Sequence, residues 1–181
     1  MSQSLDATDR HIIKGCRKGD AKAQAQLYHR YKASLFGVCL RYARDRQEAE
    51  DFLQEGFIQI YKDLYQYRPT GSFPAWLRKV VVNVALQQLR KKKNIFSSVE
   101  LERIADQHET EEDLFSQFRA KALLKMVQQL PDGYRAVFNL YVIEGYTHKE
   151  IAKILSINES TSKSQLSRAK AMLRKLLEKV V

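Results

Sequence analysis

Very little in this 181-residue sequence interrupts helical patterning. It holds only seven glycines and three prolines, and apolar residues recur at three- and four-residue steps through nearly every long segment. No segment alternates apolar and polar residues long enough to indicate a strand. The pattern therefore predicts an all-α fold, with helices at 8–18, 21–31, 33–43, 46–64 and 74–92 and helical patterning again from 118.

The composition changes abruptly in the middle of the chain. Residues 94–117 hold seven acidic side chains and a single arginine. An acidic stretch between two basic, helix-rich segments is typical of a linker, although part of it could form a short helix. We therefore expect two small helical domains: an N-terminal domain at 1–94, an acidic linker at 95–117 and a C-terminal domain at 118–181, whose compact part starts near Pro131.

The formal net charge of +10 favours a polyanionic partner, either nucleic acid or an anionic membrane surface. On charge alone, a basic protein without such a partner is an equally good interpretation. No apolar run approaches the roughly 20 residues that span a bilayer, and the first residues lack the features of a signal peptide. Cys16 and Cys39 form no CxxC pair, so we expect thiols in a reducing compartment rather than a disulfide. These features predict a cytoplasmic protein.

Residues 146–169 contain the most informative local pattern. Thr147 and Glu150 have the spacing of a capping box, which predicts a helix that starts at Thr147. We expect its buried side to be formed by Ile151, Ala152 and Leu155. Residues 156–159 are short and polar enough for a tight turn, and Ser160 is suited to cap the next helix. Two helices joined by such a turn predict a helix-turn-helix in the C-terminal domain.

The helix expected after this turn has two distinct sides. The side that faces the core is predicted to hold Leu166, Ala169, Leu173 and Leu176. At about 100° per residue, the residues that point away from the core are Lys163, Ser164, Ser167, Arg168 and Arg174. Small side chains let a helix approach DNA and cations reach phosphates and guanine edges, so Arg168 is the best candidate for a bidentate base contact. A solvated basic face is the alternative, but the capped first helix and the tight turn favour DNA binding.

Residues 46–64 are expected to form a helix with an unusual exposed side. Its core stripe is predicted to be Ala49, Leu53, Phe57, Ile60 and Leu64. The residues projected to the opposite side are Asp51, Gln54, Glu55, Ile58 and Lys62. An isolated surface isoleucine needs no explanation, but Ile58 ringed by acidic and amide groups also fits a small protein-docking site. Catalysis by Asp51 and Glu55 is a weaker hypothesis, because no nucleophile, histidine or metal-ligand set accompanies them.

Residues 76–93 are expected to form a helix that buries Leu77, Val80, Val81 and Val84. Five other residues follow at steps of three or four and share one side: Trp76, Lys79, Asn83, Gln87 and Arg90. An aromatic ring, amides and cations in one row suit unpaired bases as well as duplex DNA. Trp76 taken singly fits core packing better than base stacking. The preceding segment 69–74 is expected to be a loop in which Phe73 is exposed.

In this order, these segments resemble the extracytoplasmic-function (ECF) sigma factors of bacterial RNA polymerase over nearly the whole chain. Residues 50–57 (EDFLQEGF) resemble the family's motif for docking on the largest polymerase subunit, which implies polymerase contacts by Asp51, Gln54, Glu55 and Ile58. Residues 73–83 (FPAWLRKVVVN) resemble the segment that melts the minus-ten promoter element, which implies a pocket for a flipped base formed by Ser72, Phe73 and Asn83. Residues 130–138 and 144–152 resemble the reader of the minus-thirty-five element, which implies that the major groove takes Lys163, Ser164, Ser167 and Arg168.

Two positions depart from the family pattern. Gly56 stands where the family often has valine or alanine. Ser167 stands where some members carry a larger residue. This difference bears on which minus-thirty-five sequence is recognised and does not bear on the role of the helix.

The resemblance implies a promoter-specificity factor with no catalytic activity, metal or cofactor. Its implied partners are core RNA polymerase, promoter DNA in double-stranded and melted form, and an anti-sigma factor or other recruiting protein. A helix-turn-helix regulator with a ligand-sensing or dimerising N-terminal domain is the alternative, but it leaves the exposed faces around Ile58 and Asn83 unexplained. A nucleic-acid enzyme is disfavoured because no phosphate-binding glycine loop is present and no metal-ligand spacing is found among His11, His29, His108 and His148.

Overall fold

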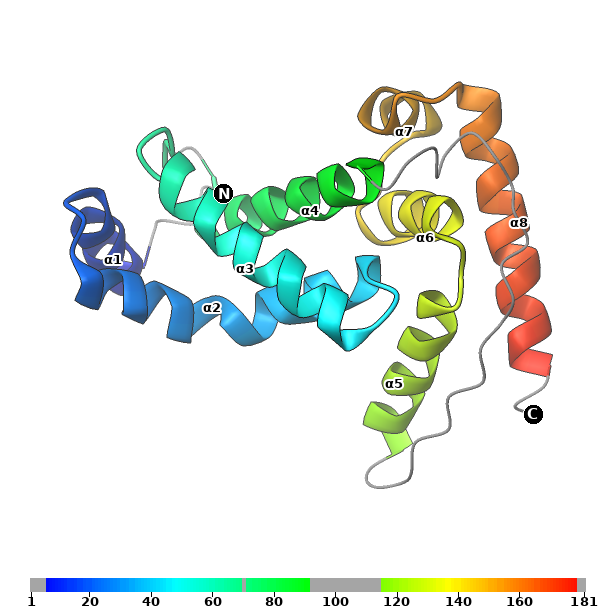
Figure 1. Cartoon of the computed structure of the whole chain (residues 1–181), viewed down its shortest axis with the longest axis horizontal. Helices are drawn as coiled ribbons and strands as arrows, with labels where there is room; N and C mark the ends of the chain where they lie inside the picture. The colour runs from blue at the N-terminus through cyan, green and yellow to red at the C-terminus, as the bar shows by residue number, and fades with distance from the viewer. Residues whose placement is uncertain (1–5, 70, 92–114, 179–181) are drawn as a thin grey trace. The chain divides into compact units, whose positions relative to one another are not determined.

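The computed structural model describes residues 6–69, 71–91 and 115–178, and the side chains of these residues except 115–120. Every regular element in these ranges is a helix (Figure 1), which confirms the predicted all-α fold. The chain divides into two compact units, Met1–Gln88 and Leu89–Val181. Of the predicted linker at 95–117, residues 95–114 lie outside the described ranges, and the last three residues begin a helix.

The N-terminal unit contains α1 (Ala7–Arg17), α2 (Ala21–Tyr42), α3 (Arg46–Asp63) and most of α4 (Phe73–Lys91) (Figure 1). An aspartate precedes each of the first three helices, and its carboxylate accepts a hydrogen bond from a backbone N–H of the first turn. These caps are Asp6, Asp20 and Asp45. They account for the sharp starts of α1, α2 and α3. Within the unit, α2 packs against both α1 and α3.

The predicted break between helices at 21–31 and 33–43 is wrong, because α2 is continuous over these residues. Its buried stripe runs without interruption through Leu27, Tyr31, Leu35, Val38 and Tyr42. These residues follow one another at steps of three or four, and neither glycine nor proline lies where the break was expected. A single amphipathic helix therefore satisfies the pattern better than two short ones.

Two glycines permit close approach between helices in this unit. A Cβ atom on Gly15 of α1 would lie 2.4 Å from the Cβ atom of Ala23 in α2. A Cβ atom on Gly56 of α3 would lie 2.9 Å from Cγ2 of Val81 in α4. Both distances are shorter than van der Waals contact, so these two helix pairs pack at a spacing that only glycine allows.

The C-terminal unit contains α5 (Phe115–Gln128), α6 (Asp132–Phe138), a π-helix η1 (Asn139–Ile143), α7 (His148–Leu155) and α8 (Glu159–Glu178). Its core cluster is formed by Leu130, Tyr134 and Ala169, against which Phe138, Met172 and Leu173 pack. α8 packs against both α6 and α7. Pro131 directly precedes α6, as expected, whereas η1 was not predicted.

A buried arginine closes the junction between α5 and α6. Arg135 is only 1% exposed, and its guanidinium donates hydrogen bonds to the carbonyl oxygens of Gln128 and Leu130, at 3.1 and 2.6 Å. It also forms an ion pair with Asp132. These contacts satisfy the carbonyl group of the last residue of α5, Gln128, and that of Leu130 in the connection to α6.

Both cysteines lie in the N-terminal unit as buried thiols without a disulfide. Burial raises the pKa of Cys16 to about 11 and that of Cys39 to about 12. Both are therefore protonated near neutral pH and unreactive. None of the helices in the described ranges is long and apolar enough to cross a membrane.

Candidate functional site

The exposed side of α3 has the composition that the sequence predicted. The predicted core stripe, from Ala49 to Leu64, is buried. Ile58 is 39% exposed, and Asp51, Gln54 and Glu55 are exposed with it. We call these four residues the docking face. An apolar side chain with two carboxylates and an amide around it can be desolvated by a protein partner whose rim is polar or basic.

Local hydrogen bonds fix the start of α3 and hence the rotation of this face. The Asp45 carboxylate accepts a hydrogen bond from the backbone N–H of Glu48 at 2.8 Å. The Glu48 carboxylate in turn accepts one from the backbone N–H of Arg44 at 2.7 Å. Glu48 is buried, so this cap anchors α3 from the side opposite to solvent.

α4 carries a polar stripe along a helix that is otherwise mostly apolar. Leu77, Val80, Val81 and Val84 are buried, as predicted. Lys79, Asn83, Gln87 and Arg90 are exposed, and Trp76 is half-buried at the start of the row. We call these five residues the α4 stripe. Because Asn83 is exposed, its amide is not a buried polar group that the fold must satisfy, and it remains available to an external partner.

The prediction that Phe73 lies exposed on a loop is wrong. Phe73 is the first residue of α4 and is 1% exposed. Its ring contacts those of Tyr31, Tyr67 and Trp76, with centroid distances of 5.7, 5.1 and 5.9 Å. Proline is tolerated in the first turn of a helix, so Pro74 does not delay the start of α4 and the Phe73 side chain turns into the core.

The predicted base pocket of Ser72, Phe73 and Asn83 is therefore not one compact site. Asn83 follows Phe73 by ten positions, which corresponds to about 15 Å along a helix. The Ser72 hydroxyl accepts from the backbone N–H of Ala75 at 3.5 Å, and the Ser72 carbonyl accepts from that of Trp76 at 3.1 Å. Ser72 thus caps the N-terminus of α4, and the buried Phe73 ring packs against the Trp76 ring.

The aromatic cluster of Tyr31, Tyr67, Phe73 and Trp76 is anchored by polar contacts that no sequence pattern predicts. The Tyr31 hydroxyl donates to the two carboxylate oxygens of Asp9, at 2.8 and 2.7 Å. Arg30 pairs with the same carboxylate at 3.0 Å. Burial raises the pKa of Tyr31 to about 12, so its hydroxyl remains a donor at neutral pH. These partners lie far apart in the sequence, so no local pattern indicates them.

The helix-turn-helix geometry is present in the C-terminal unit. Thr147 caps α7 with the predicted capping box: its backbone N–H donates to the Glu150 carboxylate at 2.8 Å, and its Oγ1 accepts from the Glu150 N–H at 3.3 Å. Hydrogen bonds from the Thr147 hydroxyl, at 2.7 Å, and from its backbone N–H lower the pKa of Glu150. α7 ends at Leu155, and its C-cap residue, Ser156, has a φ of 56°, in the left-handed region. Ser160 does not cap α8, because α8 starts at Glu159 and already includes Ser160.

His148 ties the two helices of the motif together. Its Nδ1 lies 2.9 Å from Oγ of Ser162, a buried residue of α8. Its ring also stacks on that of Tyr141 in η1, with centroids 4.6 Å apart. No sequence pattern around His148 had indicated this role. Its contacts fix the angle at which α8 leaves the turn.

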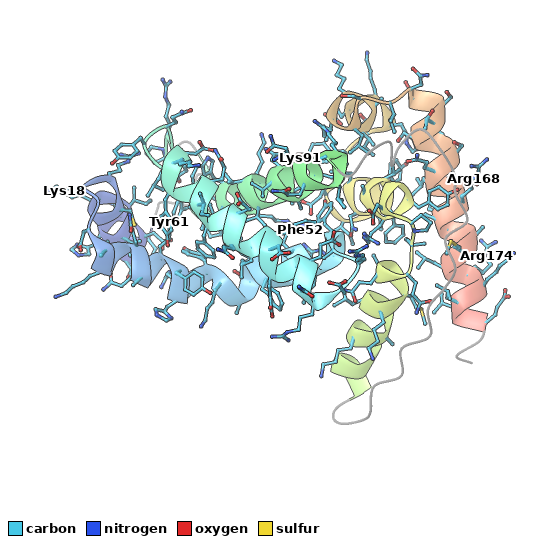
Figure 2. The ribbon with its side chains drawn as sticks, viewed as in Figure 1. Lys18, Phe52, Tyr61, Lys91, Arg168 and Arg174 are labelled. Carbon is cyan, nitrogen blue, oxygen red and sulfur yellow. The ribbon has the colours of Figure 1, made fainter. Side chains whose placement is uncertain are left out.

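All five residues predicted to face outward from α8 are exposed: Lys163, Ser164, Ser167, Arg168 and Arg174. Figure 2 labels Arg168 and Arg174 on this helix. We call the first four the recognition face. Lys163 pairs with Glu159 at 2.7 Å, which lowers the pKa of Glu159. Arg168 Nη1 donates to the Tyr134 hydroxyl at 3.4 Å, so a residue of α6 steadies this guanidinium.

Within the described ranges, no group of three or more histidine, cysteine, aspartate or glutamate side chains is placed to hold a metal ion.

Comparison with known proteins assigns both units. Residues 27–95 match the family described as Sigma-70 region 2, and residues 120–173 match Sigma-70, region 4. The chain is 30% identical over 180 residues to the ECF RNA polymerase sigma factor SigW of Bacillus subtilis, with 91% of this chain and 94% of SigW covered. It is 27% identical over 182 residues to the RNA polymerase sigma-H factor of Pseudomonas aeruginosa, with 94% of each protein covered.

Among solved structures, the fold is similar to that of the sigma factor RpoE from Bartonella quintana, which was crystallised with the anti-sigma factor NepR. The TM-score is 0.51 at 22% identity, and the match covers 85% of this chain and 96% of RpoE. The matched regions contain α3, α4 and the helix-turn-helix, so a regulator with an unrelated sensing domain is excluded. The chain belongs to the ECF family of RNA polymerase sigma factors, proteins without catalytic activity that direct RNA polymerase to promoters.

Proposed function

We propose that each of the three exposed faces binds a different partner or promoter element. The docking face binds core RNA polymerase, the α4 stripe engages the minus-ten element and its melted strand, and the recognition face reads the minus-thirty-five element. The observation that carries this proposal is the α4 stripe. Lys79, Asn83 and Gln87 stay in solvent on a helix whose neighbouring valines are buried, and folding alone does not require that row.

For the docking face, the supporting chemistry is an apolar centre with an acidic and amide rim. Ile58 supplies apolar area at the centre, and Asp51 and Glu55 supply charge for a basic or polar partner surface. Small exposed apolar centres with a polar rim are where binding energy concentrates in protein interfaces. This assignment gives the polymerase a site separate from the faces assigned to DNA.

For the α4 stripe, the proposed role is to stabilise unpaired bases of the minus-ten region. Extruding a base costs a few kcal/mol, and stacking and hydrogen bonding can return that much. Trp76 offers a half-exposed ring, and Asn83 offers an amide that both donates and accepts. Lys79 and Arg90 are suited to phosphates of the same strand. Ser72 and Phe73 hold the start of α4 in place rather than contact the base.

For the recognition face, the proposed contacts lie in the major groove of duplex DNA. Arg168 would bind a guanine edge through two hydrogen bonds, and Lys163 would exchange its bond to Glu159 for a phosphate. Ser164 and Ser167 are small enough to let the backbone of α8 approach the bases. We further propose a cytoplasmic location, where the bacterial transcription machinery acts, and control by an anti-sigma factor, by analogy with the RpoE–NepR complex.

The test is reconstitution with core RNA polymerase. The protein should copurify with the core enzyme at a one-to-one ratio and should start transcription at a small set of genomic sites that share minus-thirty-five and minus-ten sequences. Mapping of RNA 5′ ends identifies those sites. Copurification without initiation at any shared sequence would contradict the assignment of the α4 stripe and the recognition face.

A further inference from the structure

One cation of the recognition face is held by a different helix. The Arg168 guanidinium lies exposed on α8 (Figure 2), and its Nη1 donates to the hydroxyl of Tyr134 in α6 at 3.4 Å. The other cation of this face, Lys163, pairs with Glu159 of its own helix, and both side chains of that pair are exposed. Of these two cations, Arg168 is therefore the one that is attached to the core of the unit.

Tyr134 is a rigid point of attachment. It is 8% exposed, and it belongs to the core cluster with Leu130 and with Ala169, the residue that follows Arg168 on α8. The neighbouring Arg135 anchors α6 by donating to two carbonyl oxygens that precede this helix. The ring and the backbone of Tyr134 are thus both held, which fixes the place of its hydroxyl beside α8.

Packing does not require a hydroxyl at this position. The core cluster around the Tyr134 ring is apolar, and phenylalanine would make the same contacts with Leu130 and Ala169. A hydroxyl at the edge of a core must be desolvated, at a cost that its hydrogen bond has to offset. Because Arg168 is exposed, water could satisfy its donors without Tyr134. The hydrogen bond therefore suits a task in which the orientation of the guanidinium matters.

Reading a single base pair is such a task. Two parallel hydrogen bonds from an arginine to O6 and N7 of guanine form only when the guanidinium fork is aligned with the edge of the base. A flexible side chain loses rotamer freedom when it binds, and ordering it beforehand reduces that cost. Tyr134 engages one of the N–H donors of Arg168, and an arginine has five, so a pair remains for guanine.

Resting on the proposed role of the recognition face, we infer that Tyr134 is a positioning residue that determines specificity at the minus-thirty-five element. Its hydroxyl orders the Arg168 guanidinium in the free protein, in the orientation that binds a guanine edge. Tyr134 acts through Arg168 and does not contact DNA. Loss of the hydroxyl should therefore reduce discrimination at one base pair and leave the affinity for other sequences unchanged.

The test is Tyr134→Phe, which keeps the ring in the core and removes the hydroxyl. Each protein is combined with core RNA polymerase, and its affinity is measured for promoters with single base-pair changes in the minus-thirty-five element. The wild type should prefer G·C at one position by roughly 5–150-fold, the range for one bidentate contact. Tyr134→Phe should reduce this preference by about two- to tenfold. Tyr141→Phe, which removes the hydroxyl of an exposed tyrosine in η1, should match the wild type.

Two further measurements show whether Tyr134 acts through Arg168. In an Arg168→Ala background the preference should already be lost, and Tyr134→Phe should have no further effect. In the free protein, NMR relaxation of the Arg168 Nε–H group should show an ordered side chain in the wild type. In Tyr134→Phe this group should become as mobile as that of Arg174, which is exposed on the same helix.

An unchanged base-pair preference in Tyr134→Phe would overturn the inference. So would an even loss of affinity for all sequences, because the hydroxyl would then bind a phosphate, contact the polymerase or serve the fold. An effect that persists in the Arg168→Ala background, or equal mobility of Arg168 with and without the hydroxyl, would overturn it as well.

Arg168→Ala distinguishes this failure from that of the proposed function. If Arg168→Ala abolishes the preference and Tyr134→Phe leaves it unchanged, the role of Tyr134 is wrong and that of the recognition face stands. If Arg168→Ala changes no base-pair preference, the proposed role of Arg168 in the recognition face is itself wrong.

Discussion

The Phe73 ring lies against the Trp76 ring, with centroids 5.9 Å apart and planes 11° apart. One ring is buried and the other is half-exposed at the start of the α4 stripe. This stack connects the core of the N-terminal unit to the surface assigned to the minus-ten element. Under the proposed function, the buried Phe73 ring would therefore influence DNA binding through the position of Trp76 and not by direct contact.

Replacing Phe73 with alanine should destabilise the protein rather than affect DNA alone. Truncation of a fully buried phenylalanine typically lowers the free energy of unfolding by about 3–5 kcal/mol. Urea denaturation followed by circular dichroism measures the loss, and Phe73→Leu, which keeps most of the apolar volume, should lose much less. A Phe73→Ala protein with wild-type stability and a defect only in promoter opening would mean that the side chain contacts DNA.

The Gly56–Val81 contact predicts a sign reversal between two backgrounds. Gly56→Ala should destabilise the wild type, because the new Cβ would lie 2.9 Å from Val81 Cγ2 and core overpacking costs about 1–3 kcal/mol. In a Val81→Ala background the same change should stabilise the protein, because the helix propensity of alanine in a helix interior is more favourable than that of glycine by about 1 kcal/mol. The four free energies of unfolding form a double-mutant cycle. Additive effects would show that the two helices do not meet at these residues.

Replacing Ile58 with lysine should weaken binding to core RNA polymerase by a few kcal/mol, as at an interface hot spot, and leave the fold intact. The reason is that a charge would replace the apolar centre of the docking face. Leu177→Lys provides a matched control, because Leu177 is exposed to a similar extent (43% against 39%) but lies on α8. Fluorescence anisotropy with labelled protein gives both affinities. Equal affinities of folded Ile58→Lys and wild-type protein for core RNA polymerase would show that the docking face is not the polymerase-binding site.

The two cations of the recognition face should differ in what they recognise. Arg168→Ala should lose roughly 1–3 kcal/mol on the cognate minus-thirty-five duplex and relax the preference at one base pair. Lys163→Ala should weaken binding evenly across sequences and reduce the salt slope by about 1, as expected of a phosphate contact. Binding to a set of duplexes with single base-pair changes separates these patterns. Equal losses for Arg168→Ala on cognate and scrambled duplexes would make it a phosphate contact.

Periodicity was sufficient to predict which sides of α3, α4 and α8 face solvent, since that depends only on the 3.6-residue repeat and on which side is apolar. The start of α7 followed from the Thr147–Glu150 capping box, which is also local. Whether these faces bind polymerase and DNA as proposed stays a prediction.

Features that depend on distant contacts could not be predicted in this way. Phe73 is buried because Tyr31 and Tyr67 come from other parts of the chain to cover it. The segment after α3 is attached to α1 because Arg17 donates hydrogen bonds to the carbonyl oxygens of Leu64 and Tyr67, about fifty positions away. The family resemblance suggested a pocket shared by Phe73 and Asn83, but the helical rise between them separates the two by about 15 Å.

Permanganate reactivity of thymines in the minus-ten element measures whether exposed side chains of α4 stabilise its unpaired strand, as we propose. Asn83→Ala should bind core polymerase normally, because Asn83 is exposed and its loss should change stability by no more than about 0.5 kcal/mol. With Asn83→Ala on duplex promoter DNA, the minus-ten thymines should react with permanganate far less than with the wild-type protein. A Gln26→Ala control, which removes an exposed amide from α2, should give wild-type reactivity. On a pre-melted promoter, the variant should show a changed base preference at one position. Full wild-type reactivity with Asn83→Ala on duplex DNA would show that Asn83 does not stabilise the melted strand.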